Sequence, residues 1–315
     1  PTHDSASWRF NYIVVNGLTC LKHVNTPTAG HETVTYSGKP HYFPGTTDRT
    51  LPRVASHTRD PGFGQPAIET RYTYGSNDSN NANDHNFLGY GSNIAWSDDG
   101  LDNLYKVSSN YEYETQEHLW DASSNRAIRS TRRVYNRFHL MRTEEVKQNA
   151  LLDDNDTLFV TDIEYHIYPW MDFKDQPNYC QLPKTITQIW RKASYTHPRH
   201  TEVVSTTYDN FGNVLIQTNA DGVTETYTWY DKNGEEGCPA DPQQFVRNLK
   251  SKTVTPAPSA YGDAPTLQHR YSYTAHEGLN GSQPWLAMSE ETLTQVSKGD
   301  ASAVLRTITH EYQND

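Results

Sequence analysis

Cysteine is scarce in this sequence of 315 residues, with three in all at Cys20, Cys180 and Cys238. The number is odd and the spacings are long, so a disulfide framework is not expected. No two of the three stand at the short spacing that zinc sites use. We therefore expect no metal site and no cofactor, and we interpret the thiols as buried or incidental side chains.

Long hydrophobic runs and positive charge are also lacking. No apolar stretch approaches the roughly 20 residues that a membrane-spanning helix needs, so no membrane span is predicted. The net charge is −11, whereas affinity for nucleic acid depends mainly on cations that meet phosphates. The most basic segment, STRRVYNR, is short and flanked by acids. The sequence therefore predicts no nucleic-acid partner.

The sequence is rich in tyrosine instead. Hydrophobic residues make up 34% and aromatic residues 12%, with 21 tyrosines. Tyrosine packs an apolar ring while its hydroxyl group keeps a polar partner. This combination favours sheets with one wet face over a helical bundle.

Short alternating segments predict a mostly β, antiparallel fold. Threonine, valine, tyrosine and isoleucine recur at every second position, which is the period of a half-buried strand. The segments are HETVTYSG, IETRYTYG, NYEYETQEH, TLFVTDIEYHIY, KTITQIWRK, TEVVSTTY, VTETYTWY, HRYSYT and ETLTQV. Turn-forming stretches such as DNFGN, NADG and DKNG separate them. The helical candidates are few: NRAIRSTRRVY, EEVKQNALL, and PQQFVRNLKSK with Asp241 as its cap.

One motif occurs twice in the stretch TTYDNFGNVLIQTNADGVTETYTWYDKNG. Tyr208-Asp209 is followed by Gly212, and Tyr230-Asp231 is followed by Gly234, with a further turn glycine at Gly222. The aspartate can accept a hydrogen bond from the backbone two residues on, and the glycine supplies a positive φ. Each unit is therefore interpreted as a hairpin turn, with the tyrosine ring covering it. VYNRFHLMRTEEV, with Tyr135-Asn136, is interpreted as a degenerate copy.

These residues resemble the YD repeat of Rhs proteins and of the B and C subunits of bacterial toxin complexes. The resemblance implies a β-sheet ribbon that curves into a hollow shell around a toxin segment. It also implies a secreted or extracellular bacterial protein whose partner is the rest of the parent polypeptide or a partner toxin subunit. The aspartyl self-cleavage core of such proteins is not visible. Because the chain opens on Pro1 and THEYQND begins another unit, we expect it to be a piece of a longer repetitive chain.

No catalytic residue is predicted, and the protein is not expected to be an enzyme. The pair His197 and His200 in THPRH lacks the glutamate of a metal-binding helix. Adjacent carboxylates such as Glu144-Glu145 point to opposite faces of a strand. Cys180 has no evident partner base, so we interpret it as structural.

Carbohydrate binding is the alternative function, as in an adhesin or another β module of a large YD-repeat surface protein. Exposed aromatic rings on a sheet can stack on sugar rings, and the candidates for this role are Trp170 and Trp190, followed by Trp229 and Trp285. Packing on the sheet face is the competing interpretation for each of them. The predicted organisation is a β-rich segment over residues 1–100 and a YD-repeat-like sheet over residues 101–315.

Overall fold

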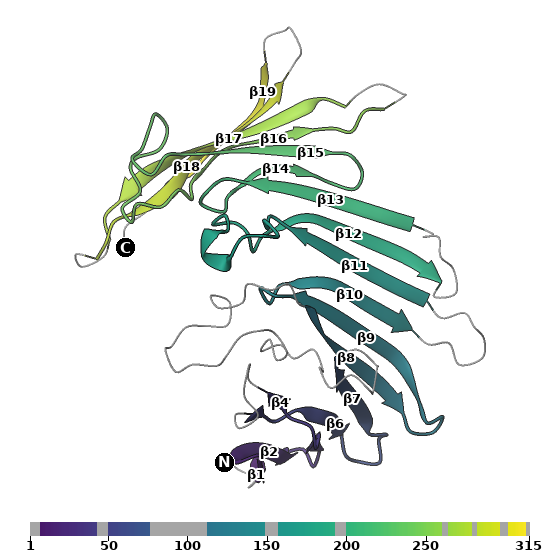
Figure 1. Cartoon of the computed structure of the whole chain (residues 1–315). Coiled ribbons are helices and arrows are strands. Elements are labelled where there is room, and N and C mark those ends of the chain that lie inside the picture. Colours follow the sequence, from purple (N-terminus) through teal and green to yellow (C-terminus); the bar gives the residue numbers. More distant parts are fainter. Residues whose placement is uncertain are drawn as a thin grey trace. The chain divides into compact units, whose positions relative to one another are not determined.

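The computed structural model describes residues 7–42, 50–75, 112–148, 157–192, 200–259, 264–278, 282–296 and 302–312 (Figure 1). Nearly all of its regular structure is strand, and the helical part of these residues is one short 3-10 turn, η1 (Phe173–Asp175). None of the described helices is long and apolar enough to cross a membrane. The strands are β1 (Arg9–Val15), β2 (Leu18–Asn25), β3 (His31–Tyr36), β4 (His41–Tyr42), β5 (Thr50–Leu51), β6 (Val54–Asp60), β7 (Ile68–Tyr74), β8 (Glu112–Asp121), β9 (Arg126–Asn136), β10 (Met141–Gln148), β11 (Thr157–Tyr165), β12 (Pro183–Lys192), β13 (His200–Tyr208), β14 (Val214–Thr218), β15 (Thr224–Trp229), β16 (Leu249–Thr255), β17 (Thr266–His276), β18 (Trp285–Val296) and β19 (Ala303–Thr309).

The chain divides into two compact units. The first comprises Pro1–Ile163, Tyr168–Gln176 and Thr187–Thr201, and the second comprises Glu164–Ile167, Pro177–Ile186 and Glu202–Asp315. The boundary predicted near residue 100 falls in 76–111, which lies outside the described residues.

Strands of the first unit pair antiparallel with their neighbours in the chain. The pairing runs from β1 to β2 and β3, then from β3 to β6, and from β6 through β7, β8, β9 and β10 to β11. Strands β4 and β5 form a separate short pair. The β1–β2 connection is Asn16-Gly17, whose φ angles of 50° and 80° are the positive values that a tight hairpin turn requires.

Strands of the second unit follow the same plan, with β13 to β19 each pairing antiparallel with the next. The predicted alternation is present in β15, where Tyr227 and Trp229 are half-buried while Thr226 and Thr228 are exposed. The prediction of a mostly β, antiparallel fold is therefore confirmed.

The three helix predictions are wrong where the structure describes them. NRAIRSTRRVY lies almost entirely in strand β9, and EEVKQ lies in strand β10, while residues 149–152 are outside the described part. PQQFVRNLKSK is a loop that enters strand β16 at Leu249. Asp241 caps a turn there, as described below, but no helix follows it.

Charge pairing across the sheet explains why strand β9 tolerates two adjacent arginines. Arg132 and Arg133 point to opposite faces, and each bridges a glutamate of β8 and a glutamate of β10. The pairs are Arg132 with Glu114 (2.5 Å) and Glu145 (3.2 Å), and Arg133 with Glu117 (2.8 Å) and Glu144 (2.6 Å). Cross-strand pairs of opposite charge stabilise a sheet. The adjacent Glu144 and Glu145 thus point to opposite faces of the sheet, as predicted, and each is paired with an arginine.

The hydrophobic core of the described residues is sparse. The buried hydrophobic side chains are Tyr113, Val134, Phe138, Val160, Cys180, Tyr230, Cys238 and Ala287. Most other strand residues are half-buried. Hydrogen bonds and ion pairs between strands therefore contribute much of the specificity of this fold.

Candidate functional site

The first repeat turn is built by Asp209. Its Oδ1 accepts hydrogen bonds from the backbone amides of Phe211 (2.8 Å) and Asn213 (2.9 Å). The Asp209 amide donates to the carbonyl of Asn213 (2.9 Å), which closes the hairpin between β13 and β14. Gly212 donates its amide to the Asp209 carbonyl (3.1 Å) and has a φ of 86°. The side-chain carboxylate and the glycine together define this turn.

The degenerate copy after Tyr135 forms the same turn between β9 and β10. Asn136 Oδ1 accepts from the amides of Phe138 (2.9 Å) and Leu140 (3.1 Å), and the Asn136 amide donates to the Leu140 carbonyl (3.0 Å). The glycine position is occupied by His139, with a φ of 60°. A non-glycine residue is uncommon at such an angle, although histidine is among the more tolerant types.

The Gly222 turn has the same backbone bonds with a different side chain. The Asn219 amide donates to the Val223 carbonyl (2.9 Å), and Gly222, with a φ of 86°, donates to the Asn219 carbonyl (2.9 Å). The side-chain acceptor is Asp221, whose Oδ1 takes the Val223 amide (2.9 Å). This turn connects β14 to β15.

The second Tyr-Asp unit begins a turn but does not close a hairpin, which corrects the prediction. Asp231 Oδ1 accepts from the Asn233 amide (2.8 Å), and Gly234, with a φ of 81°, donates to the Asp231 carbonyl (3.0 Å). The chain then makes an excursion over residues 235–248 before strand β16 returns beside β15. The Tyr230 amide bonds to the Asn248 carbonyl (2.9 Å) at the far end of this excursion.

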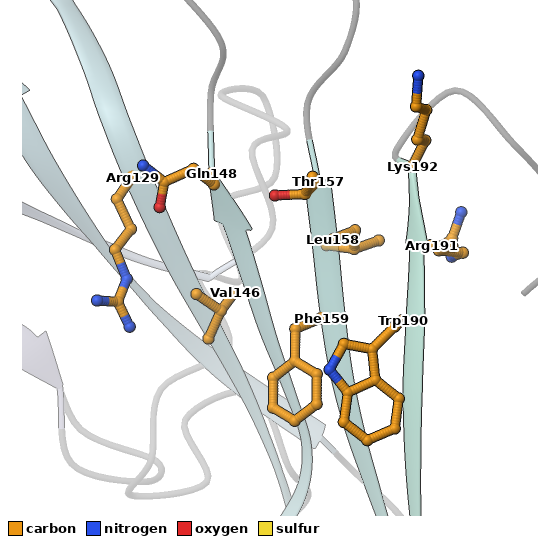
Figure 2. A pocket seen from close by; sticks show the side chains of 9 residues that line it. All are labelled: Arg129, Val146, Gln148, Thr157, Leu158, Phe159, Trp190, Arg191 and Lys192. Atoms are coloured by element: carbon orange, nitrogen blue, oxygen red, sulfur yellow. The ribbon is translucent and has the colours of Figure 1, made fainter. Parts of the chain in front are cut away.

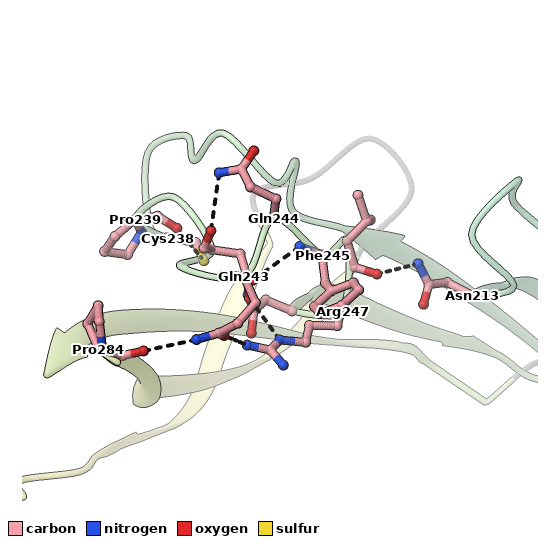
Figure 3. Close-up of polar contacts among 11 residues, drawn as sticks. Asn213, Cys238, Pro239, Gln243, Gln244, Phe245, Arg247 and Pro284 are labelled. Carbon is pink, nitrogen blue, oxygen red and sulfur yellow. Dashed lines mark hydrogen bonds and ion pairs between the residues drawn. The ribbon is translucent and has the colours of Figure 1, made fainter. Parts of the chain in front are cut away.

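Asp241 organises the excursion, and Figure 3 shows its neighbours Gln243, Phe245 and Arg247. Its side chain is 1% exposed, and its Oδ1 accepts from the amides of Gln243 (2.9 Å) and Phe245 (3.1 Å), while Oδ2 accepts from Arg247 Nε (2.8 Å). Burial acts to raise the pKa of this carboxyl group, but the two amides and the guanidinium outweigh it and lower the pKa. Asp241 is therefore a buried, ionised turn-former.

The excursion is also tied to the first repeat turn. Asn213 Nδ2 donates to the Val246 carbonyl (2.8 Å). Gln243 Nε2 donates to the Pro284 carbonyl (3.3 Å), and Figure 3 shows this second contact. The two Tyr-Asp units are thus connected through residues 241–248 and do not act as independent hairpins.

The tyrosines of the motif do not cover their own turns, which is a second correction. The Tyr208 hydroxyl donates to the Pro183 carbonyl on β12 (3.1 Å), and the Tyr230 hydroxyl donates to the Tyr271 carbonyl on β17 (2.8 Å). Both therefore reach across to another strand.

The alternate strands β14, β16 and β18 of the second unit carry β-bulges, in which the extra residues are Leu215, Lys250 and Ser289. Each of them follows a residue that lies opposite an aromatic side chain. These opposing pairs are Val214 with Tyr208, Leu249 with Trp229, and Met288 with Tyr273. A further bulge, with Leu305 of β19 as the extra residue, lies outside this pattern. A bulge disrupts the ladder locally and bends the strand. The carbonyl before each bulge then needs a partner from elsewhere.

An aromatic side chain further along the chain supplies that partner at the bulges in β14, β16 and β18, and the donors come from β15, from β17 and from Tyr312, which follows β19. Trp229 Nε1 donates to the Val214 carbonyl (2.8 Å), the Tyr273 hydroxyl to the Leu249 carbonyl (3.1 Å) and the Tyr312 hydroxyl to the Met288 carbonyl (3.0 Å). We call this arrangement of a bulge, its preceding carbonyl and a Tyr or Trp donor an aromatic clasp. Trp229 and Tyr273 each belong to two successive clasps, as donor in one and as the opposing ring in the next.

The first unit contains the same aromatic clasp. Lys22 is the extra residue of a bulge in β2, Leu21 lies opposite Tyr12, and the Tyr36 hydroxyl on β3 donates to the Leu21 carbonyl (2.7 Å). Tyr36 in turn lies opposite Val54 at another bulge. The clasp is therefore a repeated device of both units, including segments that have no Tyr-Asp pair.

A pocket of about 420 Å³ lies on the first unit, across strands β9 to β12 (Figure 2). Its aromatic floor is Trp190 with Phe159, whose ring centroids are 5.0 Å apart. The Trp190 ring also lies beside the His200 ring, with a distance of 5.2 Å between the ring centroids. The lining residues are Arg129, Val146, Gln148, Thr157, Leu158, Phe159, Trp190, Arg191 and Lys192. The sequence singled out Trp190 but missed its neighbours, because they come from four separate strands.

Trp170 does not belong to this pocket. Its side chain is 90% exposed, on the turn that precedes η1. Arg137, itself 4% exposed, donates from Nη2 to the carbonyls of Pro169 (3.1 Å) and Met171 (2.6 Å) and holds this turn in place. Gln176 Oε1 accepts a hydrogen bond from the Tyr168 amide (2.8 Å), and Gln176 Nε2 donates one to the Tyr168 carbonyl (2.8 Å). The two candidate tryptophans are thus separate, one in a pocket and one on a fixed, exposed turn.

The described residues offer little nucleophilic or metal-binding chemistry. Burial raises the pKa of the Cys180 thiol. Burial, followed by the charges of Asp241 and Glu235, raises the pKa of the Cys238 thiol to about 11. Both thiols are therefore protonated and unreactive at neutral pH. No group of three or more His, Cys, Asp or Glu side chains gathers in the described part of the chain, and His197 lies outside it.

Comparisons with known proteins give distant structural neighbours. No family model matches the chain, and no curated protein matches it. The crystal structure of TcdB2-TccC3-Cdc42 is similar at 13% identity and a TM-score of 0.26, over 92% of this chain and 15% of that chain. The Photorhabdus luminescens Tc holotoxin pore with a mutated TccC3 is similar at 13% identity and a TM-score of 0.24, over 87% of this chain and 14% of that chain. The chain thus spans a small part of these toxin-complex proteins, and the likeness is weak.

Proposed function

We propose that this chain is a wall segment of a secreted bacterial Rhs/YD-repeat toxin component. Its role is structural and not enzymatic: it contributes strands to a shell that encloses or delivers a toxin. Its partners are the rest of the parent polypeptide or a partner toxin subunit. The observation that carries the proposal is the aromatic clasp, which recurs on alternate strands of the second unit and again in the first.

The clasp explains how such a wall is made. Each bulge bends its strand and increases the local twist, and regularly placed bulges are a means of curving a sheet. A bend is stable only if the carbonyl that leaves the ladder is hydrogen-bonded. Because Trp229 and Tyr273 each link one bulge to the next, every added pair of strands repeats both the bend and its support. No reactive group is needed for this task.

Protection of an enclosed polypeptide tests the proposal. The native parent protein is treated with a protease that does not cut the folded wall, and the surviving peptides are identified by mass spectrometry. We expect a segment from outside residues 1–315 to survive in the wild type. A Tyr273→Phe, Trp229→Phe double variant, which removes the donors of two clasps, should open the wall and lose that segment. Complete digestion of every segment outside the wall in the wild type would contradict the proposal.

Carbohydrate binding is the second candidate function, favoured by the position of Trp190 in the pocket. Binding pockets combine an apolar floor with a few placed polar groups, and the Phe159–Trp190 floor with Gln148 and Thr157 has this composition. A glycan array with the wild-type protein, Trp190→Ala and Trp170→Ala tests it. We expect signals that are lost in Trp190→Ala and kept in Trp170→Ala. Signals that are equal in all three proteins would contradict it.

A further inference from the structure

The pocket around Trp190 consists of two parallel rows of side chains that cross the strands. In the apolar row, Val146 of β10 lies opposite Phe159 of β11, and the Phe159 ring contacts Trp190 of β12. In the polar row, Gln148 lies opposite both Arg129 of β9 and Thr157 of β11.

The two rows lie on one face of the sheet. Gln148 is two positions from Val146, and Thr157 is two positions from Phe159, so each pair points the same way. Lys192 is two positions from Trp190 and continues the polar row on β12. Figure 2 shows Val146, Phe159 and Trp190 below Gln148, Thr157 and Lys192.

The polar row is positively charged, although the chain as a whole has a net charge of −11. Arg129 and Lys192 stand at its two ends, with the neutral Gln148 and Thr157 between them, and none of the described residues that line the pocket carries a carboxylate. A ligand that fits must therefore offer an apolar face to one row, and hydroxyl groups together with a negative charge to the other. The volume of about 420 Å³ is that of a small-molecule site.

We propose that this pocket binds an acidic saccharide, with a uronate unit as its recognised element. One face of a pyranose ring consists largely of C–H groups and stacks on Trp190. Its hydroxyl groups meet Gln148 and Thr157, and its carboxylate meets Arg129 at one end of the polar row. The inference rests on the second proposed function and adds the charge of the ligand to it.

A matched pair of ligands tests the proposal. Oligogalacturonate and its fully methyl-esterified form have the same rings, but the ester lacks the negative charge. Isothermal titration calorimetry with the full chain should show that the ester binds about tenfold more weakly, because charge-assisted hydrogen bonds are the stronger ones. Affinity for the acid should fall with added salt, and affinity for the ester should not.

Variants test which row provides the preference for the acid and which row provides binding of the sugar ring. Arg129→Gln should reduce the preference for the acid and leave ester binding intact. Trp190→Ala should abolish both, and Trp170→Ala, with an exposed tryptophan elsewhere on the unit, should change neither. Because Trp190 also packs on Phe159, far-UV circular dichroism checks each fold, and Trp190→Phe provides a milder variant that should retain part of the binding.

The outcomes separate this inference from the function on which it rests. Equal, Trp190-dependent affinity for acid and ester would overturn the acidic preference and leave carbohydrate binding in place. The same holds if Arg129→Gln keeps the preference. Binding of neither ligand would overturn this inference, and an array without Trp190-dependent signals would overturn carbohydrate binding itself.

Discussion

The Tyr273 hydroxyl is the most informative single group in the second unit. It donates to the Leu249 carbonyl (3.1 Å), which immediately precedes the bulge at Lys250. Tyr273→Phe removes this donor and keeps the ring that lies opposite Met288. Loss of the hydrogen bond costs about 1 kcal/mol, and a carbonyl left without a partner increases the cost to about 1–3 kcal/mol. We expect the free energy of unfolding to fall by about 1–2 kcal/mol.

The assay combines urea denaturation with hydrogen exchange measured by mass spectrometry. The midpoint of unfolding should decrease, and amide protection should fall most in peptides from β16 and β17, where the clasp is lost. Tyr271→Phe is the matched control, because it removes a hydroxyl group two residues away that has no hydrogen-bond partner among the described residues. Its effect should stay within about 0.5 kcal/mol. Equal effects of the two variants would refute the role of the clasp.

The pH dependence gives a second measure of the same group. Burial is the main reason that the pKa of Tyr273 is raised to about 12. Because the folded-state pKa lies above the ordinary value of about 10, this group contributes stability that is fully present below about pH 10 and is lost as the pH rises toward 12. The stability of the wild type should therefore decrease over that window by more than the stability of Tyr273→Phe. Parallel curves would contradict this assignment.

Three further predictions concern the turns and the thiols. In thermal melts, Gly234→Ala should destabilise the folded protein by about 3 kcal/mol or more, because the φ of Gly234 is positive and a Cβ there would lie 2.5 Å from the Ala240 amide nitrogen. Gly212→Ala should cost about 1–2 kcal/mol, because the nearest atom to its Cβ would be a Leu182 methyl group at 3.5 Å. A larger loss of stability in Gly212→Ala than in Gly234→Ala would contradict the turn geometry. Asp241→Asn should lower the free energy of unfolding, measured by urea denaturation, by about 2–4 kcal/mol. Because the folded-state pKa of Asp241 is lowered, the wild type should lose stability as the pH falls below about 4, and this acid transition should be absent from the variant. In thiol labelling at pH 8, Cys20 should react in the folded protein, whereas Cys238, which is 2% exposed, should react only after unfolding. Rapid labelling of both thiols would show that residues 235–248 are not packed as described.

Sequence patterns identified the strands well, because a two-residue period depends only on neighbouring positions. TEVVSTTY and VTETYTWY are strands β13 and β15, and the turns at Asp209 and Gly222 lie between them through β14. The failures came where pairing between strands overrides local propensity. NRAIRSTRRVY has the composition of a helix, but its arginines are matched by glutamates from β8 and β10, which only the folded register reveals.

The aromatic clasps and the pocket were beyond sequence reasoning for a related reason. A bulge is a property of two strands in register, so the extra residue Lys250 cannot be recognised from β16 alone. The bond from Trp229 to the Val214 carbonyl joins strands β15 and β14 at positions that no short motif links. The pocket likewise takes its rows from four strands. A usable signal was a tyrosine or tryptophan near or just beyond the end of a strand, which the Tyr-Asp motif captured only in part.

A cryo-electron microscopy map of the parent protein that contains this chain would show whether these strands form part of a wall. We predict that residues 200–312 form consecutive strands of a curved wall around an enclosed space, with Trp229, Tyr273 and Tyr312 donating to the carbonyls before the bulges in β14, β16 and β18. A map in which these strands close into a separate compact domain, with no enclosed space beside them, would contradict this prediction.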